Sequence, residues 1–390
     1  MKRLEILDGL RGYFLVFMLL NHLSFTGGYL LVKINHAEFG FVEDAQGFVF
    51  LSGLLIGMVY ARRMATKGFH IAASAIWNRA SELYAYALGC LLIVLVLHRL
   101  LPGSEVYWHP WLGELDLGDG RLMVAAATLL YQPTYMDILP QYIVYLNVSP
   151  PLVWLCVTGR WAWVAGGCAV LWLAVQLGLH LPAGAAIDEA LALRAHFNVL
   201  TWQVVFMTGL MLGVATVRGQ IDWDRIFRAD RPQLAIIATV MLVFFAAWRL
   251  WTANADLPEP LMQRFIAHGN RGEFGLIYLL NFMALAYLVT WLIRAAPQSE
   301  WVPVRRLGLL LNGLFSLSFL RLLGRHSLQV YAWHVIMVYL FKAVDHGWGP
   351  FNEPTKTVIA LTGITLLALP ALLRERTVGE LLRLRFADRS

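Results

Sequence analysis

An acid, an arginine and a histidine interrupt the first long apolar stretch of the chain, residues 4–32: Asp8, Arg11 and His22. We expect this stretch to form a membrane-spanning helix, which turns about 100° and rises about 1.5 Å per residue. Arg11 and His22 would then differ by roughly 20° around the axis and by about 16 Å along it. Asp8 lies three residues before Arg11, where the two side chains can pair. Ionisable groups in a membrane are costly and face the bundle interior or a water-filled cavity, so the pattern predicts a polar passage along this helix.

Arg11 and His22 suit two parts of one reaction. A guanidinium is planar and always charged, which favours phosphate binding. An imidazole is the side chain best suited to general-base work near neutral pH. The pair therefore fits a negatively charged cytoplasmic substrate whose reactive end reaches His22. A plainer interpretation also stands for each residue alone, in which Arg11 reaches the headgroups and His22 is a hydrogen-bonded core residue.

The composition predicts an all-α polytopic membrane bundle. The chain is 59% hydrophobic and 14% charged, against about 45–50% and 25% in soluble domains. We expect one integral-membrane domain, residues 1–390, ending in a short basic cytoplasmic tail, 374–390. The ten predicted spans are residues 10–32, 40–61, 76–98, 138–158, 161–181, 199–217, 233–252, 274–294, 326–346 and 356–373. The three cysteines lie within apolar stretches, so no disulfide framework is predicted.

The basic residues predict the orientation of the bundle. With ten spans, the two termini and the loops on their side hold more than twice as many Lys and Arg as the opposite side. The positive-inside rule then places both termini in the cytoplasm and explains the net charge of +6 without a nucleic-acid partner. Leu122 to Tyr131 and Leu307 to Leu323 are too short or too interrupted to count as spans. An eleventh span over 307–323 would move the basic tail outside.

Acidic and basic groups flank the second span. Glu43 and Asp44 precede it on the outer side, where they either orient His22 or belong to a solvated loop. Ser52-Gly53 and the Gly-x-x-x-Gly at 53–57 favour close helix packing over catalysis. The loop after this span contains Arg62, Arg63, Lys67 and Arg79, and Arg79 is a candidate for the same anion as Arg11.

Two further segments carry candidate contacts for substrates. Tyr131 to Tyr142 is aromatic, polar and proline-rich, which suits a sugar, although aromatic belts are the ordinary explanation for such rings. The candidate contacts for this sugar are Tyr135, Asp137, Gln141 and Gln46. The run Leu323 to His334 contains His326 and His334, which are candidate contacts for the negatively charged substrate. The sequence contains no metal-ligand cluster, phosphate-binding loop or glycine-flanked nucleophilic serine, so no metal is expected.

The ordered set of motifs resembles the OpgC family, within the acyltransferase-3-like membrane acyltransferases. The matching motifs are Leu7-Asp8-Gly9-Leu10-Arg11-Gly12, Phe48-Val49-Phe50-Leu51-Ser52-Gly53, Asp137-Ile138-Leu139-Pro140 and the run from Leu323 to His334. The resemblance covers essentially the whole chain. It implies an O-acyltransferase of a bacterial inner membrane that moves a succinyl group from cytoplasmic succinyl-CoA to a hydroxyl of an osmoregulated periplasmic glucan.

The resemblance also implies roles for single residues. His22 would be the catalytic base, Asp8 would hold Arg11, and Arg11 would contact the phosphates of the donor. Arg79, with Arg63, would belong to the basic loop that serves the donor, beside His326 and His334. Two departures from the pattern matter. Gln46 stands where the family often has an acid, which leaves a carboxylate role to Glu43 or Asp44. Glu82 stands where a second arginine often follows the Arg79 position.

Two other functions stay open. A secondary transporter of an anionic substrate would use the same polar passage, but it would predict inverted repeats and broken, paired helices, which the sequence does not show. An acetyltransferase acting on another cell-surface glycan would differ only in its donor and acceptor. A succinyl carboxylate would need a further cation, for which Arg249, Arg264 and Arg271 are loose candidates. The expected co-substrate is acyl-CoA, the expected partners are a glucan and the lipid bilayer, and the oligomeric state is open.

Overall fold

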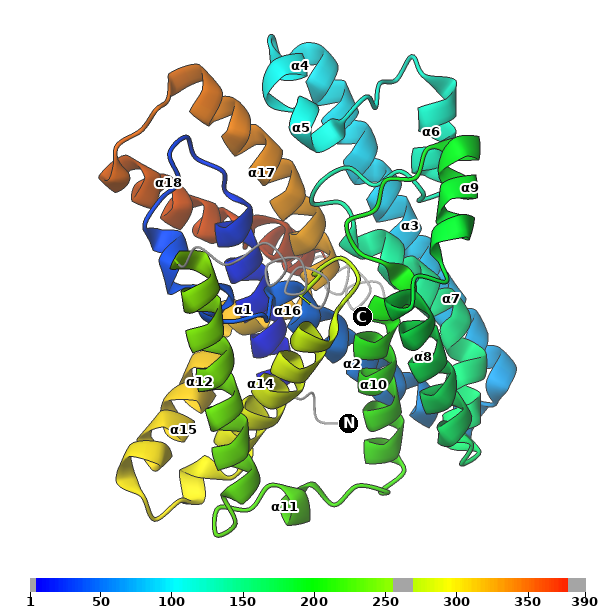
Figure 1. The fold of residues 1–390 in the computed structure, drawn as a ribbon, viewed down its shortest axis with the longest axis vertical. Coiled ribbons are helices and arrows are strands. Elements are labelled where there is room, and N and C mark those ends of the chain that lie inside the picture. Colours follow the sequence, from blue (N-terminus) through cyan, green and yellow to red (C-terminus); the bar gives the residue numbers. More distant parts are fainter. Residues whose placement is uncertain (1–4, 255–268, 378–390) are drawn as a thin grey trace, which may run out of the picture. The chain divides into compact units, whose positions relative to one another are not determined.

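The computed structural model describes residues 5–254 and 269–377, and the elements in these ranges are helices (Figure 1). The all-α prediction is confirmed for this part of the chain, where an isolated bridge joins Tyr131 and Arg194. The described chain forms two compact units. Among the described residues, unit 1 comprises 5–35, 88–110 and 312–377, and unit 2 comprises 36–87, 111–254 and 269–311. Arg264 and most of the predicted basic tail, 378–390, lie outside the described residues.

Unit 1 is built around the first helix and the C-terminal helices. Its elements are α1 (Glu5–His22), η1 (Leu31–Ile34), α4 (Ser104–Tyr107), α16 (Ser318–Arg325), α17 (Ser327–Trp348) and α18 (Glu353–Leu366). Three helices pass from one unit into the other: α3 (Phe69–Leu100), α5 (His109–Leu112) and α15 (Val302–Phe315).

Unit 2 contains the middle of the chain. Its elements are η2 (His36–Phe39), α2 (Asp44–Lys67), α6 (Gly120–Ala127), α7 (Ile138–Val157), α8 (Trp161–Gln176), α9 (Leu181–Leu191), α10 (Val199–Val217), α11 (Trp223–Ile226), α12 (Gln233–Asn254), α14 (Leu276–Arg294) and η3 (Ala296–Gln298).

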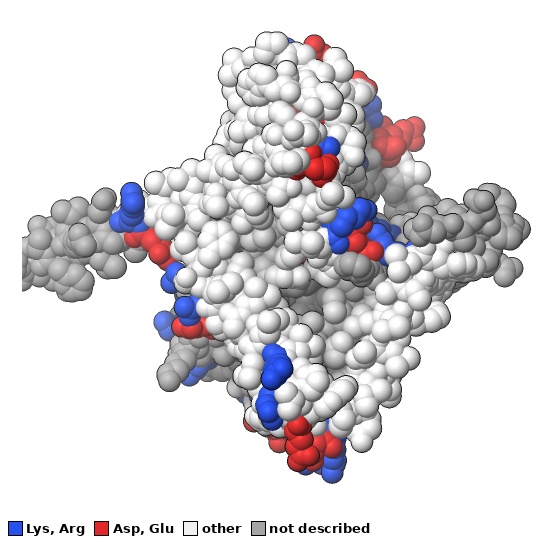
Figure 2. Space-filling view, turned by 90° about the vertical axis from the view of Figure 1, so that its left-hand side faces the viewer, with Lys and Arg blue, Asp and Glu red and all other residues white. Residues whose placement is uncertain are grey.

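Seven helices of the described chain are long and apolar enough to cross a membrane, and the number rises to nine if two bent pairs each form one span. The bent pairs are α8 with α9, at 77°, and α15 with α16, at 53°. The second pair contains the interrupted stretch Leu307 to Leu323, and α6 has only 8 residues, so both doubtful stretches are interrupted or short as predicted. The total of ten spans and the cytoplasmic location of both termini stay predictions. Figure 2 shows one face of the molecule, on which charged side chains occupy only small patches.

The first helix is shorter than the sequence predicts. The apolar stretch predicts a helix through Val32, but α1 ends at His22. The segment after it turns at Gly27 and Gly28, whose φ angles are +80° and +70°. Glycine adopts this left-handed region without the steric cost that other residues meet. His22 is therefore the last residue of its helix, where the chain changes direction.

In unit 1, glycines let α1 touch its neighbours backbone to backbone. A Cβ atom added at Gly9 or Gly12 would collide with the carbonyl oxygen of Phe315 or of Leu320. A Cβ at Gly324 would collide with the carbonyl oxygen of Asp8. Small residues permit such close approach of membrane helices. The glycines of two of the matching motifs therefore meet in one helix contact.

In unit 2, glycines on α2 and α10 interlock in the same way. Gly53 and Gly57 lie against the backbone of Phe206 and Leu210, and Gly209 and Gly213 lie against the backbone of α2. Ser52 donates its hydroxyl to the carbonyl oxygen of Phe48 within its own helix, at 2.8 Å. The packing interpretation of the Gly-x-x-x-Gly at 53–57 is confirmed.

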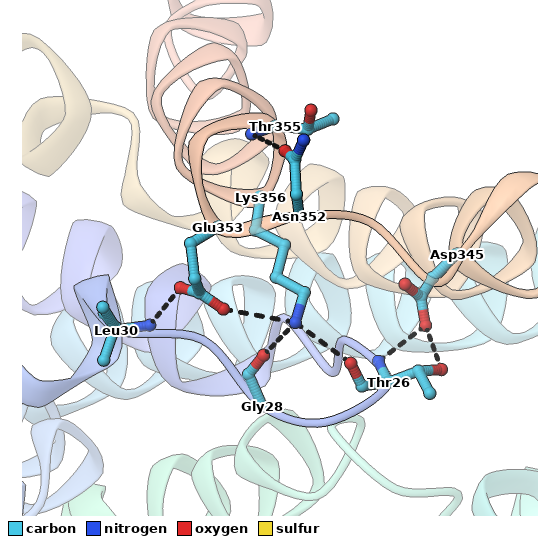
Figure 3. Close-up of polar contacts among 8 residues, drawn as sticks. All are labelled: Thr26, Gly28, Leu30, Asp345, Asn352, Glu353, Thr355 and Lys356. Atoms are coloured by element: carbon cyan, nitrogen blue, oxygen red, sulfur yellow. Dashed lines mark hydrogen bonds and ion pairs between the residues drawn. The ribbon is translucent and has the colours of Figure 1, made fainter.

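A buried lysine holds the segment after α1 (Figure 3). Lys356, in the first turn of α18, is 5% exposed. Its ammonium group donates to the carbonyl oxygens of Thr26, at 3.0 Å, and Gly28, at 2.6 Å, and lies 3.3 Å from a Glu353 oxygen. Glu353 also accepts from the backbone N–H of Leu30, at 2.9 Å. Asp345 on α17 accepts from both the backbone N–H and the hydroxyl of Thr26. The chain just beyond His22 is thus attached to both C-terminal helices.

Replacing Lys356 by Met should destabilise unit 1. The variant keeps most of the length of the side chain but leaves the carbonyl oxygens of Thr26 and Gly28 without this donor, at a cost of about 1–3 kcal/mol. Thermal unfolding in detergent should show a lower midpoint for Lys356→Met than for the native protein. Lys342→Met is the matched control, because Lys342, on α17, is only half-buried. Equal midpoints for the two variants would contradict this role of Lys356.

Candidate active site

The polar residues of α1 face α17 at two levels. Near the start of α1, Arg11 donates from Nη2 to the hydroxyl of Ser327, at 2.6 Å, and Ser327 is the buried first residue of α17. At the end of α1, Nδ1 of His22 lies 2.9 Å from Nε2 of His334. The two helices therefore run in the same direction here, with a cation at one level and two imidazoles at the other. The rise of a helix puts these levels about 16 Å apart along α1.

The imidazole pair is the part of this arrangement that the sequence did not indicate. His22 is half-buried and His334 is 0% exposed. The ring centroids lie 5.1 Å apart with the ring planes at 33°. Nδ1 of His334 lies 2.9 Å from the carbonyl oxygen of Tyr331. The sequence predicts His334 beside the donor, which stays a prediction, and the structure places His334 against the predicted base.

Asp8 and His326 are close in sequence to the two residues that meet at the Arg11 level. Asp8 lies three residues before Arg11, and His326 immediately precedes Ser327. Asp8 is buried, at 6% exposed, and its pairing with Arg11 stays a prediction. His326, which precedes α17, has Nε2 3.4 Å from Glu375, and Arg325 lies 3.0 Å from the same carboxylate. Eight residues separate His326 from His334, a rise of about 12 Å along a helix. The two histidines of this run therefore belong to different levels.

Unit 2 holds a second set of predicted residues around one ion pair. Glu43, which caps α2, accepts from Nε of Arg271 at 2.7 Å. Burial raises the pKa of Glu43, and Arg271 and Arg249 oppose this rise. Gln46 completes the cap, since its side-chain oxygen accepts from the backbone N–H of Glu43 at 3.3 Å. Arg271 also lies with its guanidinium carbon 5.3 Å from the ring centre of Phe197. A loose candidate of the sequence, Arg271, is thus the partner of a predicted acid.

Asp137 and Tyr135 lie within electrostatic reach of this ion pair. Burial raises the pKa of Asp137 from 3.8 to about 6, and the charge of Glu43 adds to the rise while Arg271 opposes it. Burial raises the pKa of Tyr135 to about 12, so its hydroxyl keeps its proton. The ring of Tyr135 packs edge-on against Trp111, with centroids 5.1 Å apart. Its φ is +71°, an outlier for a bulky residue, and such outliers cluster at functional sites.

The remaining candidates in unit 2, which are Asp44, Gln46 and Gln141, are buried. Asp44 lies 3.8 Å from Nε2 of His36, whose pKa is lowered by burial to about 4. Gln141 accepts from the hydroxyl of Tyr145 at 3.3 Å. Among the described residues, the side-chain nitrogens of Gln46 and Gln141 are buried and have no hydrogen-bond partner. Orientation of His22 by Glu43 or Asp44 stays a prediction, because in unit 2 these acids face Arg271 and His36.

The stretch after the second span, which the sequence predicts as a basic loop, is helical instead: Arg63 lies in α2, Arg79 lies in α3, and Gly68 alone separates the two helices. On α3 the acid that departs from the family pattern pairs with a predicted contact for the acyl donor. Glu82 pairs with Arg79 at 2.5 Å across three residues of α3, and both side chains are more than a third exposed. Such an exposed pair is worth little in free energy, so it leaves Arg79 available to an anion. Arg63 is half-buried near the end of α2. The donor contacts expected from Arg63 and Arg79 stay predictions.

Sequence reasoning missed two partners in these sites. Ser327 lies inside one of the matching motifs, and its place as the residue that starts α17 was the available signal. The pairing of His334 with His22 had no signal, because the residues are 312 positions apart.

Comparison with known proteins identifies the family. A family model described as "OpgC protein" matches residues 2–378, which is nearly the whole chain. No curated protein and no solved structure gave a match. The resemblance inferred from the motifs is confirmed: the chain belongs to the OpgC family, and this membership implies an acyltransferase that modifies glucans.

Proposed function

We propose that the protein is a membrane O-acyltransferase that moves a succinyl group from cytoplasmic acyl-CoA to a hydroxyl of a periplasmic glucan. The observation that carries the proposal is the two-level contact of α1 with α17, with Arg11 at Ser327 and His22 at His334. A cation and a general base on one helix, about 16 Å apart, suit a long donor with phosphates at one end and a thioester at the other.

In this proposal the donor enters from the cytoplasm. Its phosphates bind Arg11, whose guanidinium is held by Ser327, and Arg63, Arg79 and His326 are further contacts for the donor. The pantetheine arm follows α1 and brings the thioester to His22. Positioning of the two reactants supplies much of the rate, since a well-oriented reaction avoids the entropy cost of bringing them together.

The acceptor side rests on the unit 2 residues around Glu43 and Arg271. Buried carboxylates, a tyrosine hydroxyl and aromatic rings are the groups that sugar hydroxyls and sugar faces require. Asp137 accepts hydrogen bonds when ionised, and Tyr135 donates because its pKa is raised to about 12. Trp111 is buried and packs edge-on against the ring of Tyr135, which positions that ring. We infer that this cluster binds the glucan.

The chemical step is a direct transfer. His22 takes the proton of the acceptor hydroxyl, and the oxygen attacks the thioester carbonyl. The carbon–sulfur bond then breaks, and the CoA thiolate takes up the proton from His22. The three cysteines of the chain are buried or half-buried, and the proposal uses no acyl-enzyme.

Replacement of His22 by Ala should abolish most of the transfer. General-base catalysis contributes about 10²–10⁴-fold, so the rate should fall by that factor. Inverted membrane vesicles loaded with glucan and supplied with succinyl-CoA or acetyl-CoA would be assayed by the mass of the recovered glucan. We expect a succinyl increment with native protein. His70→Ala is the control, because His70 is exposed at the start of α3. Full activity of His22→Ala would refute the base assignment, and an acetyl increment alone would reassign the donor.

Replacement of Arg11 by Ala should weaken the binding of the donor phosphates. Loss of a charge-assisted hydrogen bond costs about 1.5–3 kcal/mol, which corresponds to a KM for acyl-CoA raised roughly 10- to 100-fold. The KM for acyl-pantetheine, which lacks the nucleotide phosphates, should change little. Arg160→Ala is the control, since Arg160 caps α8 and faces Trp154. If both donors were affected equally, Arg11 would not be a phosphate contact.

Replacement of Asp137 by Asn should weaken acceptor binding alone. The variant replaces an ionised carboxylate that accepts hydrogen bonds by a neutral amide. The KM for glucan should therefore rise about tenfold or more, while the KM for acyl-CoA stays constant. Tyr135→Phe should show a smaller rise, because it removes a neutral donor. Asp230→Asn is the control, because Asp230 is exposed and pairs with Arg228. A change confined to the KM for acyl-CoA would place Asp137 on the donor side instead.

A further inference from the structure

The hydrogen bonds of His334 determine which nitrogen of His22 can act as a base. Nδ1 of His334 lies 2.9 Å from the carbonyl oxygen of Tyr331. A carbonyl oxygen only accepts hydrogen bonds, so Nδ1 of His334 must carry a hydrogen. A neutral imidazole carries one hydrogen, on one of its two nitrogens. Nε2 of His334 is then an acceptor.

The acceptor nitrogen of His334 faces His22. Nδ1 of His22 lies 2.9 Å from Nε2 of His334, so Nδ1 of His22 is the donor in this contact. The same rule, one hydrogen on a neutral imidazole, leaves the lone pair of His22 on Nε2. The two hydrogen bonds therefore point the same way: Nδ1 of His22 donates to His334, and Nδ1 of His334 donates to the Tyr331 carbonyl oxygen. We call this series the relay.

Burial indicates that the His334 imidazole in this relay is neutral. His334 is 0% exposed, and its two ring nitrogens contact an imidazole and a carbonyl oxygen, neither of which is an anion. A buried charge without a compensating partner is costly. Both ring nitrogens of His334 are also occupied within the protein, which argues against a direct contact with the donor.

We infer that His334 is a positioning residue that fixes the tautomer of His22, so that Nε2 of His22 is the atom that takes the acceptor proton. The inference rests on the proposed function, in which His22 is the base. When Nε2 of His22 takes the proton, both of its nitrogens carry hydrogen, and the Nδ1 hydrogen stays bonded to His334. In other histidine sites a carboxylate sets the tautomer through the same kind of hydrogen bond. The relay explains how His22 is oriented although Gln46 stands where the family often has an acid.

The tautomer can be measured on the native protein without any assay. The eleven histidines of the chain are labelled with ¹⁵N, and NMR spectra of the ring nitrogens are recorded. The signals of His22 are those that are missing from the spectrum of His22→Ala. We expect His22 to show a protonated Nδ1 and an unprotonated Nε2 at neutral pH. A protonated Nε2 with an unprotonated Nδ1 would overturn the inference, whatever the fate of the proposed function.

Two variants of His334 separate positioning from donor binding. His334→Leu removes the nitrogen that accepts the hydrogen bond from Nδ1 of His22. His334→Gln keeps a side-chain oxygen near the position of Nε2. For His334→Leu we expect kcat to fall roughly 10- to 100-fold, because loss of such a hydrogen bond costs about 1.5–3 kcal/mol in the charged state, with the KM for acyl-CoA unchanged. His334→Gln should recover much of this loss and keep the Nδ1-protonated tautomer of His22.

The outcomes distinguish the two proposals. Native kcat in His334→Leu would overturn the positioning role, and so would a raised KM for acyl-CoA with unchanged kcat, because that result would assign His334 to the donor. Full activity of His22→Ala would instead refute the proposed function and leave the measured tautomer standing. If His334→Leu did not fold, the spectrum of the native protein and the kcat of His334→Gln would still decide the question.

Discussion

The close contact of α1 with the helices that precede α17 is the constraint on which the rest of unit 1 depends. Gly9 and Gly12 touch the backbone of Phe315 and Leu320, and Gly324 touches the backbone of Asp8. Such contacts leave no room for a shifted register, because a slip of one residue turns a helix by about 100° and would replace glycine by a larger side chain. Since α17 follows α16 after a single residue, the same contact brings Ser327 and His334 to the polar face of α1.

The main buried polar groups of the two units have partners of different kinds. In unit 1 the partners are mostly neutral: a serine hydroxyl for Arg11, an imidazole for His22, and two carbonyl oxygens for Lys356. In unit 2 the central contact is the ion pair of Glu43 and Arg271. An unpaired polar group in an apolar surrounding is expensive, so each of these groups requires a partner, and those partners give the helices a defined geometry. The polar residues that suit chemistry therefore also hold the fold.

The motifs allowed much of the molecule to be predicted, for reasons that particular residues make clear. The apolar stretches predicted helices, because only internally hydrogen-bonded structures satisfy a backbone in lipid. Gly53 and Gly57 predicted close packing, which the contact with α10 confirms. The predicted end of α1 was wrong, because an apolar run continues past His22 while the chain turns at Gly27 and Gly28. Hydrophobicity alone does not show where a helix ends when a distant lysine, Lys356, binds the turn.

The sequence by itself determined the helical class, the family, and the placement of Arg11 and His22 on one face of one helix, since these depend on composition, on the order of short motifs along the chain, and on spacing within a single element. Only the tertiary structure decided which groups meet that face. His334, Ser327 and Lys356 reach the first 28 residues of the chain from more than 300 positions away. Helical periodicity relates residues a few turns apart, and contacts across such separations depend on how the helices pack. The tautomer of His22 therefore depends on that packing, through the hydrogen bond from His334 to the Tyr331 carbonyl.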